Sequence, residues 1–171
     1  MKLLSVFIIC VSSAMIGFGR AEGLKAHYNE QIYLKKMVML IRGEIRYNCS
    51  ILSEVFASVS RKIKKPYSDI FLELSNELDK GSGEMFADIW KRSVIKKLED
   101  TKLSESDIEG FKELGECMGY LDIEMQLNHI DFYIDKLSEE IKDTGDRLEG
   151  NVKLCKALGI MGGLLLSILI I

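Results

Sequence analysis

The sequence contains very little proline and few of the residues that build catalytic or metal sites. It has one proline, Pro66, in 171 residues, and two histidines, His27 and His129. Proline is the strongest helix breaker, so its scarcity permits long uninterrupted helices. The nearest approach to a metal-binding bundle motif, Gln126-x-x-His129, lacks the glutamate that such motifs use. No serine, histidine and acid arrangement suggests nucleophilic catalysis either, so we predict neither metal nor cofactor, and no enzyme.

Cysteine and charge patterns exclude further classes of function. The four cysteines stand at positions 10, 49, 117 and 155, without a C-x-x-C pair. Free thiols that pack as small apolar groups account for them better than zinc or a disulfide. No P-loop motif of the form G-x-x-x-x-G-K-[ST] occurs, which argues against binding of ATP by such a loop. With a net charge of −3 and no arginine-rich patch, nucleic acid is not an expected partner, and no small-molecule substrate is indicated.

An apolar heptad pattern runs from Asp122 to Lys156 and is the longest regular feature of the chain. Its members are separated by 4, 3, 4, 3 and 4 residues: Ile123, Leu127, Ile130, Ile134, Leu137 and Ile141. Such spacing keeps one apolar seam on a single face of a helix. Leu148 and Cys155 continue the seam. We therefore predict one long helix that enters the apolar tail ending at Ile171.

Both ends of the chain are apolar, and we predict two transmembrane anchors. Leu3 to Gly19 carries no charge over 17 residues, and Ala157 to Ile171 carries none over 15. These lengths approach the roughly 20 residues that span a membrane. A signal peptide cleaved after Ala21 is the alternative for the first segment. The predicted domains are an N-terminal anchor at 1–20, a cytoplasmic helical bundle at 21–153 and a C-terminal anchor at 154–171.

Basic residues predict the orientation of these anchors. They lie on the inner side of both segments, and only Lys2 lies outside them. Positively charged residues favour the cytoplasmic face, so we expect a cytoplasmic bundle and both termini on the far side of the membrane. Small residues at helical spacing, Ser13-x-x-x-Gly17 and Gly159-x-x-x-Gly163 beside Gly162, predict close helix packing, with the other anchor or another protein as partner.

Apolar periodicity between the anchors predicts an all-α fold, with about six helices in the bundle. The expected helices cover 24–47, 52–63, a segment capped by Ser68 that ends at a turn over 80–83, 86–98, a segment opened by a capping box at 104–107, and the heptad. A short break is expected at 48–50. No stretch alternates convincingly with the period of two that strands require.

A group of residues near the start of the heptad helix forms our candidate site. Gly115 and Gly119 lie four residues apart in an apolar helix, where each destabilises the helix by about 1 kcal/mol relative to alanine. We expect a neighbouring backbone to approach there, such as that of the helix carrying Glu44, with direct contact to a partner protein as the alternative. Asp122 is expected to cap the next helix. Glu44 and Tyr47 are expected to be buried hydrogen-bonding groups. Gln126 and His129 are further candidates for a structural role or for contact with a partner.

An ordered set of short motifs resembles one family, the stage III sporulation protein AB (SpoIIIAB) proteins of endospore-forming bacteria. The motifs are Met15-Ile16-Gly17-Phe18, Gly43-Glu44-Ile45-Arg46-Tyr47 with Leu52-Ser53-Glu54, Phe111 to Glu116 with Gly119 and Asp122, Gln126 with His129-Ile130, and Lys156 to Gly159 with Gly162 to Leu166. Their order and spacing cover nearly the whole chain. Ile51 stands where the family is expected to have proline, and Asn128 where lysine is usual.

This resemblance implies a function as well as a fold. The family's members are membrane proteins of the mother cell, placed in the membrane that engulfs the forespore, where they join a channel complex. Their cytoplasmic domain is similar to the inner-membrane platform proteins of type II secretion and type IV pilus machines. We therefore expect a non-catalytic platform that meets a secretion-type ATPase, the AA protein of the same operon, and other channel proteins. A membrane-tethered helical adaptor without an ATPase partner is the alternative.

Overall fold

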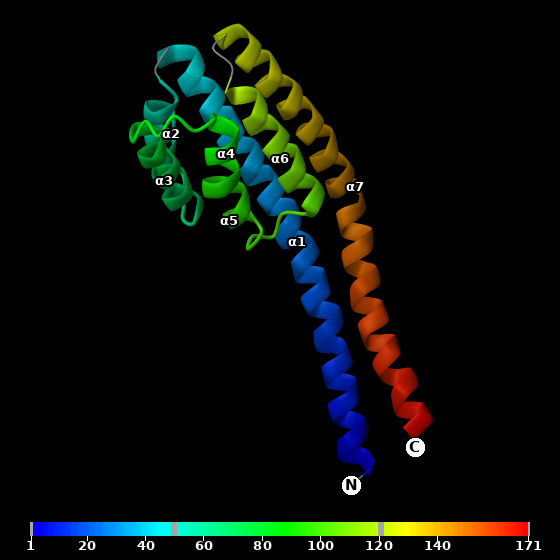
Figure 1. Ribbon diagram of the computed structural model, residues 1–171. Coiled ribbons are helices and arrows are strands. Elements are labelled where there is room, and N and C mark those ends of the chain that lie inside the picture. The colour runs from blue at the N-terminus through cyan, green and yellow to red at the C-terminus, as the bar shows by residue number, and fades with distance from the viewer. Residues whose placement is uncertain (1, 49–50, 120–121, 171) are drawn as a thin grey trace. The chain divides into compact units, whose positions relative to one another are not determined.

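The computed structural model describes residues 2–48, 51–119 and 122–170, which form helices joined by short loops (Figure 1). In chain order the elements are α1 (Lys2–Asn48), α2 (Leu52–Ser60), α3 (Tyr67–Asp79), α4 (Phe86–Trp90), the π-helix η1 (Lys91–Ile95), α5 (Lys96–Leu98), α6 (Glu105–Met118) and α7 (Ile123–Ile170). Because α4, η1 and α5 follow one another without a gap, the described residues form six helical segments and no strand. The predicted all-α class is confirmed.

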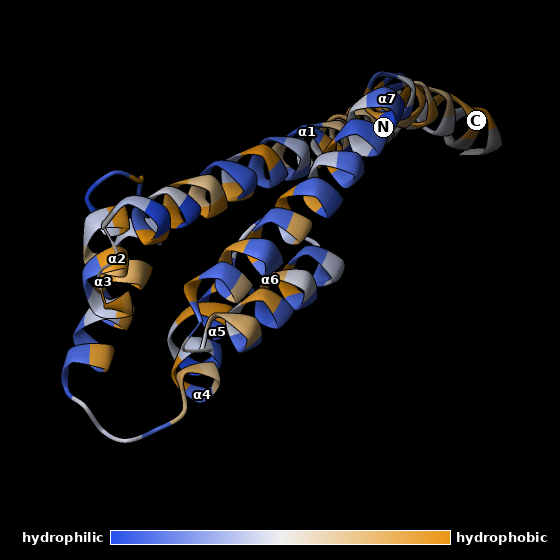
Figure 2. Cartoon of the chain, turned by 90° about the horizontal axis from the view of Figure 1, so that it is seen from above, coloured by the Kyte–Doolittle hydropathy of each residue, from blue (hydrophilic) through white to orange (hydrophobic). Residues whose placement is uncertain are grey.

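The chain divides into two compact units. The terminal unit combines the residues up to Asn29 with those from Ile141 on, and the central unit comprises Glu30–Glu140. The terminal unit is therefore a pair of helical segments, one from α1 and one from α7. The central unit contains the remainder of these two helices and all the shorter ones. Helices in Figure 2 carry hydrophobic and hydrophilic stripes side by side, as amphipathic helices do.

The core of the central unit is built around one tryptophan. Trp90 is fully buried, and its ring lies 4.9 Å from that of Phe111, 5.7 Å from that of Phe56 and 5.8 Å from that of Phe86, measured between centroids. These tilted arrangements are the favoured geometry for aromatic pairs. The indole Nε1 donates a 3.2 Å hydrogen bond to the carbonyl oxygen of Phe111. Trp90 thus links α4 to α2 and α6 while its one polar group is satisfied.

Helix ends agree with the sequence at one predicted cap and differ at another. The capping box of α6 is present, because Ser104 Oγ accepts from the Asp107 backbone N–H while the Asp107 carboxylate accepts from the Ser104 N–H. The prediction that Ser68 caps α3 is wrong. That helix begins at Tyr67, after Pro66, and has no side-chain cap. α1 ends at Asn48, and the predicted break at Asn48 to Ser50 otherwise lies outside the described residues.

The fourth predicted helix contains a π-helical segment that periodicity did not reveal. η1 inserts i→i+5 hydrogen bonds between α4 and α5, so the apolar positions before and after it are offset from those of a regular α-helix. Ser93, Val94 and Ile95 of η1 are buried. The segment therefore widens the helix where it packs against the core.

α7 is continuous, as predicted, but its buried seam within the central unit is rotated. Ile130 and Leu137 of the predicted seam are buried, whereas Ile123 is 40% exposed. Two polar residues, Gln126 and Tyr133, are buried instead. A heptad pattern identifies the buried face of a helix from apolar residues alone. Here α6 accommodates two larger polar side chains, because the Met118 carbonyl oxygen accepts a hydrogen bond from Gln126 and Gly110 leaves space beside the Tyr133 ring.

A buried polar contact joins α1 to the start of α6. Gln31 Nε2 donates a 2.8 Å hydrogen bond to Asp107 Oδ1, and both side chains are almost fully buried. Asp107 thus serves the capping box and the helix interface together. Burial raises the pKa of Tyr133, whose hydroxyl finds no hydrogen-bond partner among the described residues. The phenol therefore remains protonated at physiological pH.

Membrane-spanning helices were predicted at both ends of the chain, and the structure does not support them. Among the residues described, no helix is long and apolar enough to cross a membrane.

Candidate functional site

Gly115 lies where α6 meets the central tryptophan. A Cβ atom at this position would stand 2.1 Å from Trp90 Cδ1 and 2.2 Å from Trp90 Nε1. Such distances are far inside van der Waals contact, and the ring has no free space because it is fully buried. The glycine is therefore required by the packing of Trp90, so its neighbour is a side chain of α4 and not the backbone of the helix that carries Glu44.

Gly119 and Asp122 frame the turn between α6 and α7. Gly119 is the C-cap of α6, and a Cβ there would lie 3.4 Å from Phe86 Cβ, an ordinary contact distance. A small side chain would therefore fit at Gly119, unlike at Gly115. The predicted cap on α7 is present, since Asp122 Oδ1 accepts a 3.0 Å hydrogen bond from the Glu124 backbone N–H.

Gln126 ties the start of α7 back to the end of α6. Its Nε2 donates a 3.0 Å hydrogen bond to the carbonyl oxygen of Met118, and the side chain is buried. This bond satisfies one of the last carbonyls of α6, which have no partner within their own helix. Gln126 therefore takes the place of a helix-capping group. His129, one turn further, is half-buried beside α6.

Glu44 and Tyr47 were predicted as a pair of buried groups, but the structure separates them. Glu44 is buried and its carboxylate forms an ion pair with Lys62 of the chain beyond α2. Tyr47 is 84% exposed, so its predicted burial is wrong. Tyr47 lies three residues after Glu44 in the last turn of α1, which ends at Asn48, and its side chain is open to solvent there.

The sequence did not reveal an ion pair that joins α1 to α7. The Arg42 guanidinium binds both carboxylate oxygens of Asp131, with Nε donating to Oδ1 and Nη2 donating to Oδ2 at 2.8 Å. These hydrogen bonds hold the pKa of Asp131 below its ordinary value and raise that of Arg42. Two-point contact fixes the helices in register. Because the partners are 89 residues apart, no local pattern could have found them.

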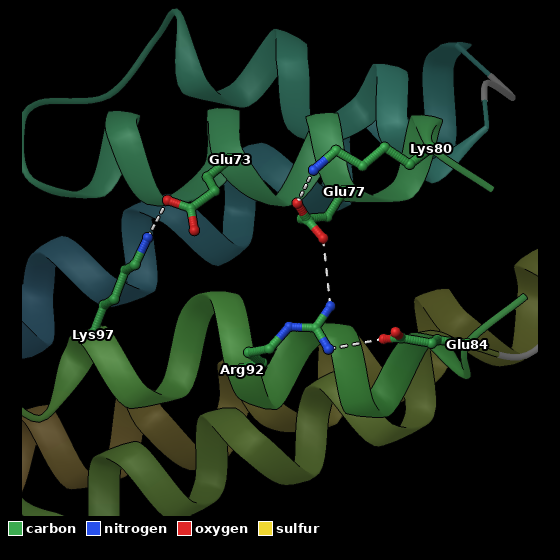
Figure 3. A network of polar contacts seen from close by, with 6 residues as sticks. All are labelled: Glu73, Glu77, Lys80, Glu84, Arg92 and Lys97. Atoms are coloured by element: carbon green, nitrogen blue, oxygen red, sulfur yellow. Dashed lines mark hydrogen bonds and ion pairs between the residues drawn. The ribbon is translucent and has the colours of Figure 1, made fainter. Parts of the chain in front are cut away.

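A second network of charges joins α3 to the α4–α5 segment (Figure 3). Lys97 pairs with Glu73, and Arg92 contacts both Glu84 at 2.9 Å and Glu77 at 3.4 Å, while Lys80 also pairs with Glu77. Glu73 and Glu77 are four residues apart, one turn of α3, whereas Arg92 and Lys97 are five apart. The i→i+5 hydrogen bonds of η1 make the five-residue spacing of Arg92 and Lys97 comparable to the four-residue spacing of Glu73 and Glu77 in α3. Both basic side chains therefore reach α3.

A groove of about 150 Å³ runs between α6 and α7. α6 contributes Gly110, Leu114 and Cys117 to it, and α7 contributes His129, Phe132 and Tyr133, with the exposed Glu113 and Lys136 also lining it. Burial raises the pKa of the Cys117 thiol, and the nearby Glu116 and Glu113 carboxylates add to this effect. We call this feature the α6–α7 groove.

The four glycines predicted to pack in the anchors lie in the terminal unit. A Cβ on Gly17 would stand 2.7 Å from the Cys155 carbonyl oxygen and 2.9 Å from Gly159 Cα, and one on Gly163 would stand 3.1 Å from Cys10 Cα. Gly162 is different, since its nearest neighbour is Ser13 Oγ at 3.5 Å. The two helical segments thus touch backbone to backbone at Gly17, Gly159 and Gly163, and each helix is the other's partner.

Hydroxyl and thiol groups complete this contact between the two segments. Ser13 Oγ donates a 2.7 Å hydrogen bond to the Gly159 carbonyl oxygen, and Cys10 Sγ lies 2.9 Å from Ser167 Oγ. Cys10, Cys117 and Cys155 all have free thiols. Within the described parts of the chain, no cluster of histidine, cysteine and acidic residues is arranged to hold a metal ion.

Comparisons with known proteins identify the family. The family model described as stage III sporulation protein AB matches residues 2–171. A protein of that name from Bacillus subtilis strain 168 is 28% identical over 170 residues, which cover 99% of each chain. A solved structure of stage III sporulation protein AB (SpoIIIAB) superposes with a TM-score of 0.64 and 24% identity, covering 72% of this chain and 96% of that one, which supports the fold. Because the family model matches nearly the whole sequence, this chain belongs to the stage III sporulation protein AB family.

Proposed function

We propose that this chain is a non-catalytic membrane platform of the channel complex that links the mother cell to the forespore during sporulation. Its central unit would engage a cytoplasmic secretion-type ATPase, the AA protein of the same operon. Its terminal unit would hold the platform in the mother-cell membrane that engulfs the forespore. Family membership supports a role in sporulation.

The observation that carries the proposal is the distribution of side chains in the terminal unit. Small groups occupy the contact between its two helical segments, while large apolar side chains point outward. Met15, Ile16, Leu165 and Ile168 are 69%, 67%, 66% and 73% exposed. Helices that associate in lipid pack through small residues because lipid, unlike water, does not drive large apolar groups inward. The arrangement is therefore suited to a hydrocarbon environment.

Charged residues support an orientation for this insertion. Basic residues flank both apolar segments on their inner sides: Arg20, Lys25, Lys35 and Lys36 after the first, and Arg147, Lys153 and Lys156 before the second. Such a bias favours a cytoplasmic location for the residues between the segments. We accordingly propose anchors at 1–20 and 154–171, a cytoplasmic bundle at 21–153, and both termini on the opposite face.

Labelling of single cysteines in intact sporulating cells tests the membrane part of the proposal. A cysteine at position 100 should be protected from a membrane-impermeant maleimide until the cells are permeabilised, whereas one at position 2 should react. Extraction with alkaline carbonate should leave the protein in the pellet. Release into the supernatant would contradict anchoring, and the reverse labelling pattern would contradict the orientation.

Binding of the ATPase separates a platform from a simple tether. The full chain in detergent micelles should retain the AA ATPase in a pull-down, and an exposed substitution in the central unit that preserves folding should abolish both retention and sporulation. A membrane-tethered adaptor makes the opposite prediction, because any stable bundle between the same anchors would then support sporulation. Replacement of the central unit by an unrelated helical bundle distinguishes the two.

A further inference from the structure

We infer that two copies of this chain associate through the α6–α7 groove, with Phe132 of each copy entering the groove of the other. Three features of the described residues carry the inference. They are an exposed aromatic ring, a groove that fits such a ring, and opposite charges placed so that two identical surfaces complement each other. The inference does not depend on the ATPase or on the membrane.

Phe132 is unusually exposed for an aromatic residue on a packed helix. Its side chain is 73% exposed on α7, whereas Tyr133 beside it is 8% exposed. Aromatic side chains bury about 150 to 250 Å² when covered and are enriched at protein interfaces. An uncovered ring beside an uncovered groove is a characteristic of surfaces that bind another protein.

The groove has the size and lining to receive this ring. Its volume is about 150 Å³, and its walls include the buried Leu114 and Tyr133 with the small Gly110 at one end. A cavity of roughly 150 Å³ with apolar walls accepts benzene. The groove therefore fits one phenyl group, and the chain itself presents one at the groove's edge.

Helix direction determines how two copies would meet. Gln126 of α7 bonds to Met118 at the end of α6, and Tyr133 lies against Gly110 near its start, so the two helices are antiparallel. A two-fold axis running along them places α7 of one copy against α6 of the other. Phe132 then faces the partner's groove, and the same contact repeats by symmetry, as in other closed dimers.

Charge complementarity supports this arrangement over a chance apolar contact. Glu113 on α6 and Lys136 on α7 are both exposed and line the same groove. With α7 against the partner's α6, each Lys136 lies opposite a Glu113 of the other copy. Two identical surfaces thereby form two pairs of opposite charge, and burial of the rings excludes water from between them.

Molar mass of the full chain in detergent micelles, measured by light scattering after size exclusion, provides the first test. The wild type should have the mass of a dimer. Phe132→Ala removes both central rings and should weaken the association by about 100-fold or more, as expected for an interface hot spot. Leu72→Ala, at a 49% exposed position on α3, is the matched control and should leave the mass unchanged. Circular dichroism should show that both variants are folded.

A charge exchange provides a sharper test. Glu113→Lys and Lys136→Glu should each be monomeric alone, because like charges then face each other twice. An equimolar mixture of the two variants should form a heterodimer, since each basic residue again meets an acidic one. Only contacts between copies predict this recovery, because a contact within one chain would be lost in both variants and remain lost on mixing.

Three results would overturn the inference. The first is a monomeric wild type at the highest soluble concentration. The second is a dimer whose affinity is unchanged by Phe132→Ala. The third is a monomeric chain that binds the AA ATPase and loses this binding on Phe132→Ala, which would assign the groove to a different protein.

Discussion

The two units of the molecule use glycine for opposite purposes. In the central unit, Gly115 makes room for the largest side chain, Trp90, and the interior is filled with aromatic rings. In the terminal unit, Gly17 and Gly159 allow two backbones to touch, and the large side chains lie outside. Glycine at helical spacing therefore does not by itself indicate a backbone contact. The identity of the neighbour decides whether the space is filled by a ring or by another helix.

Alanine at Gly115 should have the largest effect on stability and tests the role of Trp90. Its Cβ would lie 2.1 Å from a buried ring that cannot move without displacing other aromatic groups. Although alanine favours a helix by about 1 kcal/mol, overpacking at the upper end of its usual range, about 3 kcal/mol, should dominate, with a net loss of about 2 kcal/mol. Denaturant midpoints of the full chain in detergent measure this loss. Gly119→Ala, where the nearest atom is at 3.4 Å, should have a midpoint equal to or above the wild type.

Leucine at Gly159 should separate the helical segments of the terminal unit. The Cβ would lie 2.9 Å from Gly17 Cα and 3.0 Å from the Ser13 carbonyl oxygen, and a backbone cannot yield as a flexible side chain can. We expect a loss of about 1 to 3 kcal/mol and a longer distance between the helices. Spin labels at positions 15 and 161, in a chain without native cysteines, measure that distance.

Gly150→Leu is the control for this experiment, because the substitution lies in the same helix but a Cβ there has no neighbour within 4 Å. It should leave the label distance unchanged. Equal effects of the two leucines would contradict the close contact and remove the difference between the units.

Removal of a buried carboxylate should cost more than removal of an exposed one that has the same kind of partner. Glu44 is 7% exposed and pairs with Lys62, while Glu73 is 53% exposed and pairs with Lys97. Glu44→Ala should destabilise the central unit by about 1 to 3 kcal/mol, and Glu73→Ala by less than about 1 kcal/mol. Thermal midpoints at low and high salt distinguish them, since only the second loss should diminish with salt. A salt-independent loss at Glu73 would indicate a stronger role for the network in Figure 3.

The smallest expected effect depends on pH and concerns Asp131. Its pKa is lowered in the folded protein by the Arg42 hydrogen bonds, so the ion pair stabilises the fold above the unfolded-state pKa, about 3.9 for aspartate. This contribution is lost as the pH falls through the lower folded pKa. Asp131→Asn should therefore lower the midpoint at pH 7 by an amount worth up to about 1 kcal/mol, because the pair is partly exposed.

The difference between Asp131→Asn and the wild type should begin to shrink as the pH falls below about 4, where the carboxylate of the unfolded state takes up a proton, and should be lost below the lower folded pKa. Asp135→Asn, at an exposed position on the same helix, is the control and should have the wild-type midpoint at pH 7. A difference in midpoint between Asp131→Asn and the wild type that persisted in acid would show that the contact between α1 and α7 depends on packing at Asp131 and not on its charge.

Local patterns in the sequence determined most of the helices. The scarcity of proline and the apolar periodicity predicted an all-α chain, the capping box at Ser104 and the continuous α7, because each depends on residues within a few turns. Small residues in the terminal segments likewise predicted close helix contact. Motif order was sufficient to indicate the family, even though no single motif was specific.

Only the tertiary structure decided what each helix face meets. It placed Trp90 against Gly115, turned Gln126 and Tyr133 inward where apolar neighbours were expected, and left Tyr47 exposed. It also paired Arg42 with Asp131. The π-helix η1 likewise became visible only in the tertiary structure, where Arg92 contacts Glu77 of α3. Periodicity records which side of a helix is apolar, but the partner on that side comes from a distant part of the chain. The free energy of that contact depends on the shape and polarity of both surfaces, which no single segment contains.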